Sequence, residues 1–398
     1  MSVPCLNRHE GQDHGGLKMR KYLLLTVLLT LVSCLAFSCV LAENDDDDLE
    51  IEDIIESVVS ENTPALFESD GSVIITVSCT GDFTIGGDSR KKKNIFEDEL
   101  EAQGGDINFT MRNIRDLFLE DDLTLVNFEG TLTESTYVPA NKKENQFLFS
   151  APPSYVTMLS DNGVDAVSLE NNHVMDHGEE VYEETKQTLR NAGIIYSNST
   201  EMGVFEIPEK KVQIAMLSYL CIDRYEKPVD GYATLYDKVA ADIQEAKRLY
   251  PIVIVSFHWG NELDYSPTNN QIRMGRLAVD SGADLVVGHH SHRINPIECY
   301  KGVYICYSLG NFCFSGNNKP SDMNSYIFQI RFRVTEEGKV STRGFRIVPI
   351  RISSRTDRNN FVPTLVTKDT TIDAILTTLR ENGKKLEYAV DEYPLTWE

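Results

Sequence analysis

From about residue 71 onward, short runs of consecutive apolar residues recur along the chain at fairly regular distances. They are rich in valine and isoleucine, which is typical of strands buried on both faces of a sheet. We predict strands at 73–78, 123–128, 165–169, 213–219, 252–257, 283–287 and 303–308.

The segments between these runs carry apolar residues at three- and four-residue spacing, which predicts amphipathic helices. The predicted helices are 108–119, 152–162, 178–192, 236–249 and 267–281. Prolines at 152, 153 and 267 suit the first turn of a helix, and glycines at 163, 193 and 282 suit the residue after its end. Alternation of strands and helices predicts an α/β fold with helices outside the sheet.

The last third of the chain has a different pattern. Segments 325–334 and 341–352 alternate apolar and polar residues, and Glu336-Glu337-Gly338 lies between them. This pattern predicts a β-hairpin that forms a second sheet or extends the first. Residues 355–369 are predicted to be a loop, and 371–383 a terminal helix.

The N-terminal region indicates export. Residues 1–18 are polar, whereas Arg20 and Lys21 precede an apolar run over 22–42. A basic start before an apolar core is typical of a signal peptide, and about 20 apolar residues also suffice for a membrane anchor. Cleavage before Glu43, lipid attachment at Cys34 and an uncleaved helix all remain open. We therefore expect an exported, extracytoplasmic protein at the cell surface or anchored to the membrane.

Composition narrows the possible classes of protein. The 398 residues are 41% hydrophobic, which is ample for a core, and the formal net charge is -23. The acidic run 43–52 contributes to this charge and is predicted to be a solvated spacer. A nucleic-acid-binding protein should carry a basic face, so nucleic acid is excluded as a partner.

Five cysteines remain in the predicted exported part, at positions 79, 221, 299, 306 and 313. None shows Cys-x-x-Cys spacing, and most lie in apolar runs, so buried free thiols are expected. The alternative is a disulfide between Cys299 and Cys306 across a short turn.

Polar residues that can bind metals follow several of the predicted strands. These candidates are Asp82, Glu129, Asn172 with His173, His258, and His290 with His292. Ligands of α/β sheets gather beyond the carboxyl ends of the strands, so these donors converge if the strands are neighbours.

A mixture of oxygen and imidazole donors suits Mn²⁺, Zn²⁺ or Fe²⁺ better than Ca²⁺. Six or seven donors exceed the needs of one tetrahedral zinc, but suit two metals that share a carboxylate at ~3.5–4 Å. An isolated Asp after a strand is usually a cap, and an isolated His is usually a core residue. Because such explanations would have to coincide at five strand ends, a site for one or two divalent metal ions is the better hypothesis.

Several motifs together resemble the CapA family of poly-γ-glutamate capsule synthesis proteins, which are similar to calcineurin-like metallophosphatases. They occur in family order over about 73–350. The motifs are Gly81-Asp82, Asn127-Phe128-Glu129, Asn171-Asn172-His173 with Asp176 and Gly178, His258-Trp259-Gly260, Gly288-His289-His290-Ser291-His292, and the run 307–312.

The resemblance implies a four-layer α-β-β-α sandwich, here with a C-terminal β-hairpin extension. It also implies a role for each motif residue. Asp82 and His292 would bind a first metal, Glu129 would bridge, and Asn172, His258 and His290 would bind a second. His173 would donate a proton to the leaving group, and Asp176 would orient it.

One position departs from the superfamily pattern. Thr84 stands where a histidine usually follows the first aspartate by two residues, so the first metal site loses an imidazole. Which two of His289, His290 and His292 bind metal is also open. The His-x-His spacing favours 290 and 292, whose side chains point the same way if the segment is extended.

Three further features have both a structural and a functional interpretation. The basic run 89–93 is a solvated loop or steers an anionic substrate. Asn311 belongs to a tight turn beside the site or contacts substrate. Arginines of the C-terminal region are dispersed or form a dock for a polyanion; they are residues 331, 333, 343, 346, 351, 355 and 358.

The sequence therefore predicts four regions and two alternative functions. The regions are a leader with signal peptide or anchor at 1–42, an acidic spacer at 43–70, a CapA-like metallophosphatase domain at 71–355, and a loop and helix at 356–398. The first function is metal-dependent phosphoesterase-type hydrolysis in poly-γ-glutamate capsule biosynthesis. The second is non-catalytic binding, export or anchoring of poly-γ-glutamate. Partners would be an anionic envelope polymer or a phosphoester, with membrane-bound synthesis proteins.

Overall fold

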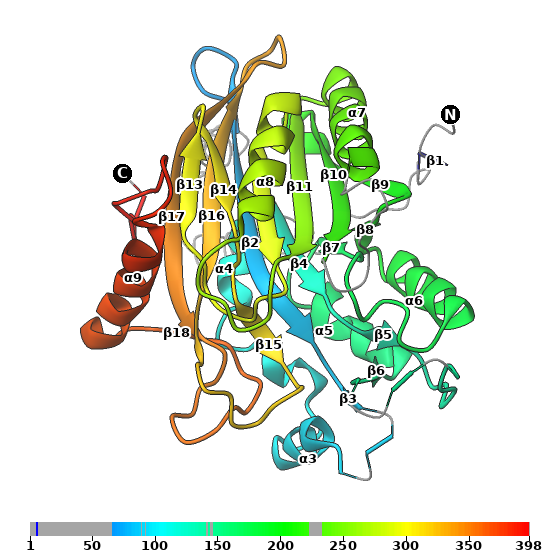
Figure 1. Ribbon diagram of the computed structural model, residues 1–398. Coiled ribbons are helices and arrows are strands. Elements are labelled where there is room, and N and C mark those ends of the chain that lie inside the picture. Colours follow the sequence, from blue (N-terminus) through cyan, green and yellow to red (C-terminus); the bar gives the residue numbers. More distant parts are fainter. Residues whose placement is uncertain are drawn as a thin grey trace, which may run out of the picture.

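The computed structural model describes residues 5–6, 66–88, 90–91, 93–140, 142–143, 146–222 and 233–397. Two large β-sheets, a small sheet and surrounding helices make up a mixed α/β fold, as predicted (Figure 1). Most of the predicted leader, signal or anchor segment and acidic spacer lies outside the described residues. No helix among the described residues combines the length and apolar character that crossing a membrane requires.

The first sheet contains the predicted C-terminal hairpin. Its strands β2, β4, β7 and β8 are parallel, and β16 joins β2 in antiparallel register. The hairpin prediction is therefore confirmed, and the hairpin extends this sheet rather than forming another. The order is β18 (Thr364–Leu365), β17 (Val340–Arg351), β16 (Asn324–Val334), β2 (Val73–Thr84), β4 (Leu123–Phe128), β7 (Ala166–Ser168) and β8 (Ile195–Ser197), with β15 (Asn311–Phe314) paired to β2.

The second sheet is parallel at its centre, where β10, β11, β12 and β14 are neighbours. Its order is β1 (Cys5–Leu6), β9 (Glu201–Ile207), β10 (Val212–Cys221), β11 (Ile252–Trp259), β12 (Leu285–His289), β14 (Val303–Cys306) and β13 (Ile297–Tyr300). A small sheet joins β3 (Gly87–Asp88), β6 (Phe149–Ala151) and β5 (Thr131–Leu132).

The longer predicted helices are present, whereas two predicted helices are broken. Segments 108–119 and 152–162 each divide into a 3-10 turn and a short helix. The helices are α3 (Ile95–Ala102), η1 (Ile107–Thr110), α4 (Arg115–Glu120), η2 (Pro153–Val156), α5 (Thr157–Ser160), α6 (Glu179–Asn191), η3 (Pro208–Lys210), α7 (Ala233–Leu249), α8 (Asn269–Ser281) and α9 (Asp369–Gly383).

The start of α8 corrects the placement of Pro267 in its first turn. Thr268 is the N-cap, and its side chain accepts from the backbone of Gln271 while the Gln271 side chain accepts from the backbone of Thr268. This capping box satisfies two free N–H groups of the first turn, so it fixes where the helix begins.

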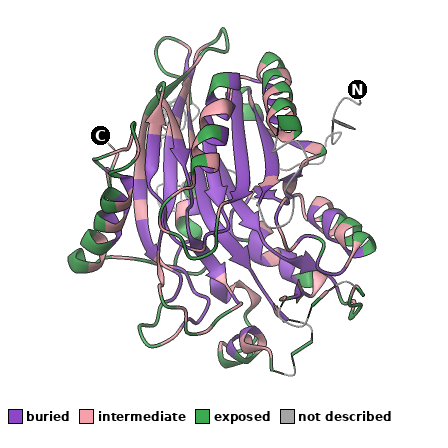
Figure 2. Ribbon diagram, in the orientation of Figure 1, coloured by how far each residue is buried: buried purple, intermediate pink, exposed green. Residues whose placement is uncertain are grey.

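Three hydrophobic clusters explain why the strands are continuous apolar runs. One cluster lies between the large sheets and includes Val77 of β2 and Ile254 of β11. The opposite faces of the two sheets pack against helices: Val126 belongs to a cluster with Phe118 of α4, and Val255 to one with Met274 of α8. Strands are thus buried while helices keep exposed outer faces (Figure 2). Both faces of the central strands are covered, as parallel sheets require.

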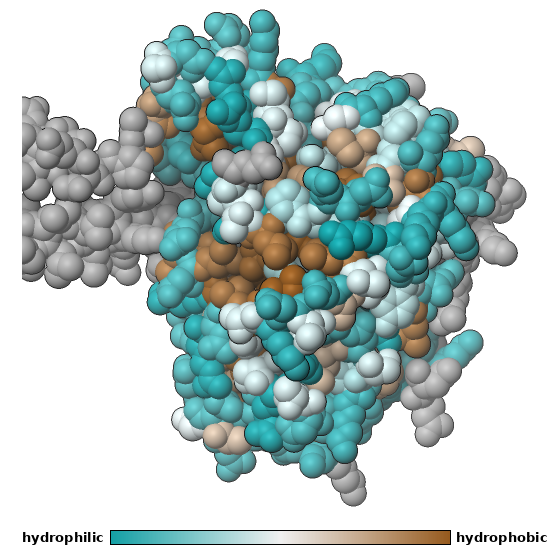
Figure 3. Space-filling view, turned by 90° about the vertical axis from the view of Figure 1, so that its left-hand side faces the viewer, coloured by the Kyte–Doolittle hydropathy of each residue, from teal (hydrophilic) through white to brown (hydrophobic). Residues whose placement is uncertain are grey.

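The C-terminal helix α9 completes the cluster between the sheets. Its residues Ile375 and Leu379 belong to that cluster and are fully buried. The side of the molecule that carries α9 is mostly hydrophilic, with a hydrophobic area near its centre (Figure 3). One face of α9 is buried and the other is exposed, as the amphipathic pattern of its sequence predicts.

None of the five cysteines of the predicted exported part, all of them described, forms a disulfide bond, as expected; they are residues 79, 221, 299, 306 and 313. Cys299 of β13 is opposite Tyr304, and Cys306 of β14 is opposite Ile297, so the two cysteines are out of register. The alternative disulfide between them is therefore wrong.

Gly288 lies where β12 passes close to its neighbours, and only a residue without Cβ fits there. An added Cβ would lie 2.1 Å from the Tyr307 carbonyl oxygen and 2.4 Å from Trp259 Nε1. We expect Gly288→Ala to lower the free energy of unfolding by about 3 kcal/mol, because the added methyl group overpacks the core and forces the neighbouring backbone to move. Denaturant unfolding measures this loss. Gly383→Ala is the control, since its Cβ would meet Ala389 and Pro296 at 3.4 Å, and an unchanged Gly288→Ala stability would contradict the argument.

Candidate metal centre

The predicted ligands meet where the carboxyl ends of strands from both large sheets face each other. Asp82 lies near the end of β2 and Glu129 directly follows β4, both in the first sheet. His258 lies in β11 of the second sheet, and His290 and His292 follow β12. The donors therefore converge between two sheets, rather than along the edge of one.

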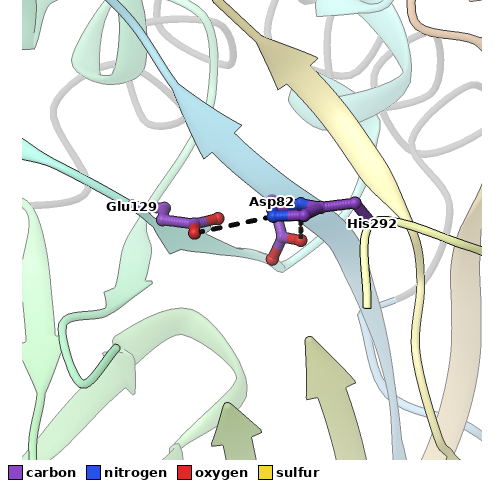
Figure 4. A group of neighbouring side chains, drawn as sticks. All are labelled: Asp82, Glu129 and His292. Atoms are coloured by element: carbon purple, nitrogen blue, oxygen red, sulfur yellow. Dashed lines mark ion pairs between the residues drawn. The ribbon is translucent and has the colours of Figure 1, made fainter. Parts of the chain in front are cut away.

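Asp82, Glu129 and His292 form a close group that could hold a metal ion (Figure 4). Their ligand atoms all lie within 4.8 Å of one another. His292 Nδ1 is 3.0 Å from Asp82 Oδ2, and His292 Nε2 is 4.0 Å from Glu129 Oε1. Pairing of β2 with β4 is irregular between Cys79 and Asp82, and such irregularities re-aim side chains at sites.

A second group of donors adjoins the first through Glu129. His258 Nε2 is 3.9 Å from Glu129 Oε1 and 2.6 Å from Asn172 Oδ1. His290 Nδ1 is 3.0 Å from the same His258 nitrogen. The structure thus places Asp82, Glu129, Asn172, His258, His290 and His292 in one connected cluster.

The backbone after β12 directs the three neighbouring histidines differently. His290 and His292 have φ of 92° and 53°, so the segment is left-handed at both residues and does not meet the condition of an extended backbone. Positive φ costs energy for residues with a Cβ and tends to occur at functional sites. His289 faces away from the cluster, with Nε2 3.1 Å from the Thr80 carbonyl oxygen and Nδ1 3.3 Å from Ser256 Oγ.

The centre carries more buried negative charge than its hydrogen bonds satisfy. Asp82 and Glu129 are fully buried. Asp82 Oδ2 and both Glu129 oxygens have no hydrogen-bond partner among the described residues, although His292 is near enough for ion pairs. A buried carboxylate without donors is costly unless a cation accompanies it. A divalent metal therefore fits this donor set.

The pKa values reflect the same crowding of charge. Burial and the Asp82 carboxylate raise the pKa of Glu129 to about 7. Burial alone would lower the pKa of His292, but Glu129 and Asp82 raise it to about 9. Burial pushes the pKa of Asp82 upward, yet His292 more than offsets this and the pKa lies below its usual value. Burial and the neighbouring His290 hold the pKa of His258 far below its usual value, which keeps it neutral as a metal ligand requires.

Asn127 supports the cluster, although the sequence suggested no role for it beyond its motif. Its Nδ2 donates to Asp82 Oδ1 at 2.9 Å and lies 3.3 Å from His258 Nδ1. Asn171 Nδ2 in turn donates to Asn127 Oδ1 at 3.3 Å and to the Phe128 carbonyl oxygen at 2.8 Å. These contacts orient the candidate ligands, as hydrogen-bonded neighbours of metal ligands commonly do.

His173 lies at the border of the cluster and contacts the predicted partner Asp176. His173 Nδ1 is 2.7 Å from Asp176 Oδ2, and His173 Nε2 is 3.8 Å from Glu129 Oε1. The imidazole therefore joins a buried carboxylate to the centre through its two nitrogens. Its role as proton donor stays a prediction.

Two further positions bear on the predicted site. Thr84 is buried on the same face of β2 as Asp82, and its Oγ1 has no hydrogen-bond partner among the described residues. Asn311 Oδ1 is 2.9 Å from His292 Nδ1, so Asn311 supports a candidate ligand directly. Contact between Asn311 and substrate stays a prediction.

Several of the basic residues singled out in the sequence have partners within the fold. In the run 89–93, Arg90 pairs with Asp88 and Lys91 lies over the Phe147 ring at 4.3 Å, whereas Ser89 and Lys92 lie outside the described residues. Three C-terminal arginines pair with carboxylates and two contact an aromatic ring. The pairs are Arg333 with Asp70, Arg355 with Asp357 and Arg358 with Glu99, and Arg331 and Arg346 lie over Trp397.

Fold and site together define a mixed α/β protein with a buried carboxylate–imidazole centre. Residues 76–316 match the family model described as "Bacterial capsule synthesis protein PGA_cap", and the chain belongs to this family. The resemblance to CapA proteins is thereby confirmed.

Relatives in bacteria carry corresponding names. The chain is 29% identical to the "PGA biosynthesis protein CapA" of Bacillus subtilis over 340 residues, which is 82% of each chain. It is 26% identical to the "Capsule biosynthesis protein CapA" of Bacillus anthracis over 325 residues, 76% of this chain and 75% of that one. A "Probable polyglutamine synthesis accessory protein" of Mycobacterium tuberculosis is 24% identical over 258 residues, 58% of this chain and 66% of the relative.

Proposed function

We propose that this protein is a CapA-like accessory protein of capsule and poly-γ-glutamate biosynthesis that carries a metal-dependent hydrolase site. Its reaction is hydrolysis of a phosphoester, or less readily of an amide, in an anionic envelope polymer or its precursor. The observation that carries this proposal is the pair of buried carboxylates, Asp82 and Glu129, whose three unsatisfied oxygens lie among imidazoles.

The residues that would hold metal divide into two sets that share Glu129. Asp82 and His292 belong to the first set, and Asn172, His258 and His290 belong to the second. Carboxylate, amide and imidazole donors suit Mn²⁺, Zn²⁺ or Fe²⁺. A divalent cation in such a site supplies Lewis acidity toward a phosphoryl or acyl oxygen.

The protein's own contribution is to position donors and move a proton. Asp176 accepts from Nδ1 of His173, which leaves Nε2 toward the centre as the atom that gives a proton to the leaving oxygen. Asn127 holds Asp82 and His258 in fixed orientations. Burial of Glu129 excludes water from its carboxylate, which strengthens electrostatic interactions inside the site.

Export and the exact layer arrangement belong to the same proposal. The basic-then-apolar segment 19–42 supports an extracytoplasmic location at the cell surface or membrane, where membrane-bound synthesis proteins are the partners. A four-layer α-β-β-α sandwich is supported by three hydrophobic clusters, one between the large sheets and one on each outer face.

Thr84 favours a second candidate function. Because a threonine stands where the superfamily usually supplies an imidazole, the first metal set has fewer donors. The centre would then hold carboxylates of poly-γ-glutamate through bound metal without cleaving the polymer. Such a protein would bind, export or anchor the polymer.

Hydrolysis of a chromogenic phosphodiester with added Mn²⁺ separates the two functions. We expect turnover that disappears on chelation and in Asn172→Ala, because Asn172 is one of the second set of ligands. Asn191→Ala, an exposed residue of α6, is the matched control. Metal-dependent retention of poly-γ-glutamate without turnover of any ester would refute the hydrolase and support the binding function.

A further inference from the structure

Behind His173 lies an ion pair that no motif indicated. Lys142 Nζ is 2.5 Å from Asp176 Oδ1, and the Asp176 side chain is completely buried. The other oxygen, Oδ2, accepts from the backbone N–H of Phe149 at 2.8 Å and lies 2.7 Å from His173 Nδ1. Three residues thus hold both oxygens of one carboxylate.

The contacts at Oδ2 alone do not fix the plane of the carboxylate. A carboxylate held at one oxygen can rotate about its Cβ–Cγ bond, which is a soft torsion. Lys142 holds the second oxygen through a charge-assisted hydrogen bond. With both oxygens held, the direction from which Oδ2 meets the His173 ring is determined.

Lys142 is itself well held, because the backbone around it is attached to the body of the protein. Arg90 donates to the Lys143 carbonyl oxygen at 3.2 Å and also to that of Gln146. His177 Nδ1 lies 2.7 Å from the Tyr137 carbonyl oxygen. The Lys142 side chain is only 16% exposed, so solvent competes weakly for its ammonium group.

The ring of His173 also contacts an aromatic side chain. Its centroid lies 4.7 Å from that of Phe149, at an angle of 57°. Phe149 also supplies the N–H that donates to Asp176. The imidazole therefore contacts one aromatic ring and one carboxylate, and the carboxylate is in turn held by Lys142.

We propose that Lys142 is a positioning residue that acts through Asp176 to fix the orientation of the His173 imidazole toward the metal centre. The inference rests on the proposed function, in which His173 gives a proton to the leaving oxygen. Lys142 touches neither the centre nor the reacting atoms; it determines where His173 Nε2 points.

The test compares Lys142→Met with Lys143→Met, a neighbouring lysine whose side chain has no contact with Asp176. On the chromogenic phosphodiester we expect Lys142→Met to lower kcat about tenfold, with KM and bound metal nearly unchanged, because misorientation affects only the proton transfer. Lys142→Arg, which keeps the charge and the donors, should recover most of the loss. Lys143→Met should match the unmodified protein.

The second readout needs no turnover. In the zinc-loaded protein with ¹⁵N-labelled histidine, His173→Gln identifies the His173 ring signals. These signals should form one sharp set in the unmodified protein and in Lys143→Met, and should broaden or split in Lys142→Met as the ring samples several orientations. If Lys142→Met is folded, unchanged ring signals overturn the positioning role. If Lys142→Met unfolds, Lys142→Arg becomes the test, and its failure to give the single sharp set of the unmodified protein overturns the role. Altered ring signals in a protein that hydrolyses no ester uphold the positioning role and overturn only the hydrolase.

Discussion

Replacement of Glu129 by glutamine should remove stabilisation by metal and at the same time make the metal-free protein more stable. Both Glu129 oxygens are buried without a hydrogen-bond donor among the described residues, and Asp82 lies beside them. Bound metal would satisfy these oxygens, whereas in the metal-free protein their burial lowers the free energy of unfolding. We expect metal affinity to fall at least about 100-fold, because even outer partners of metal ligands cost 10–100-fold.

The gain in the metal-free protein should depend on pH in a defined direction. The pKa of Glu129 is raised from 4.5 to about 7, so the folded state favours its protonated form. The contribution of protonated Glu129 to the free energy of unfolding is full below about pH 4.5 and is lost as the pH rises through about 7. Relative to the native protein, Glu129→Gln should therefore gain nothing near pH 4.5 and on the order of 3 kcal/mol above pH 7.

Thermal unfolding with and without Mn²⁺, repeated across this pH range, measures both effects. Glu209→Gln is the control, because Glu209 is an exposed glutamate far from the centre in sequence. A Glu129→Gln protein that is still stabilised by Mn²⁺ as strongly as the native protein would remove Glu129 from the ligand set.

Replacement of His173 by alanine should separate catalysis from metal binding. His173 contacts Asp176 through Nδ1 and lies 3.8 Å from Glu129 through Nε2, at the border of the donor cluster. General acid catalysis by a positioned side chain typically contributes 10²–10⁴-fold. We expect turnover of the phosphodiester to fall by about that factor while metal content stays nearly unchanged.

His292→Ala provides the contrast, because His292 lies close to both carboxylates of the candidate metal group. It should lose metal as well as turnover, measured by elemental analysis of the purified protein. Loss of metal from His173→Ala to the same extent would show that the division between ligands and proton donor is wrong.

The long, strongly patterned elements were predictable from local sequence. Strands β4 and β11 are buried at every position because both faces of each sheet are covered, and their mostly apolar sequences show this directly. Short elements such as β3 and β5 were missed, since two residues carry no recognisable period. The start of α8 depended on side-chain capping at Thr268, which overrode the preference of proline for a first turn.

The candidate ligands were also predictable, whereas their supporting residues were not. Carboxylates and histidines at strand ends are unusual enough to identify Asp82 and His258 without coordinates. Lys142 and Asn127 are residue types that occur on every surface, and their importance comes from contacts with Asp176, 34 residues away, and Asp82, 45 residues away. No local pattern records such pairings.

By itself, the sequence determined which residues can bind a cation and which segments are strands, because both follow from side-chain chemistry and short-range periodicity. Only the tertiary structure decided that the donors meet between two sheets, that the backbone turns left-handed at His290 and His292, and that Lys142 lies behind His173. These features arise from packing between segments that are distant in the sequence, and short-range patterns carry no information about such packing.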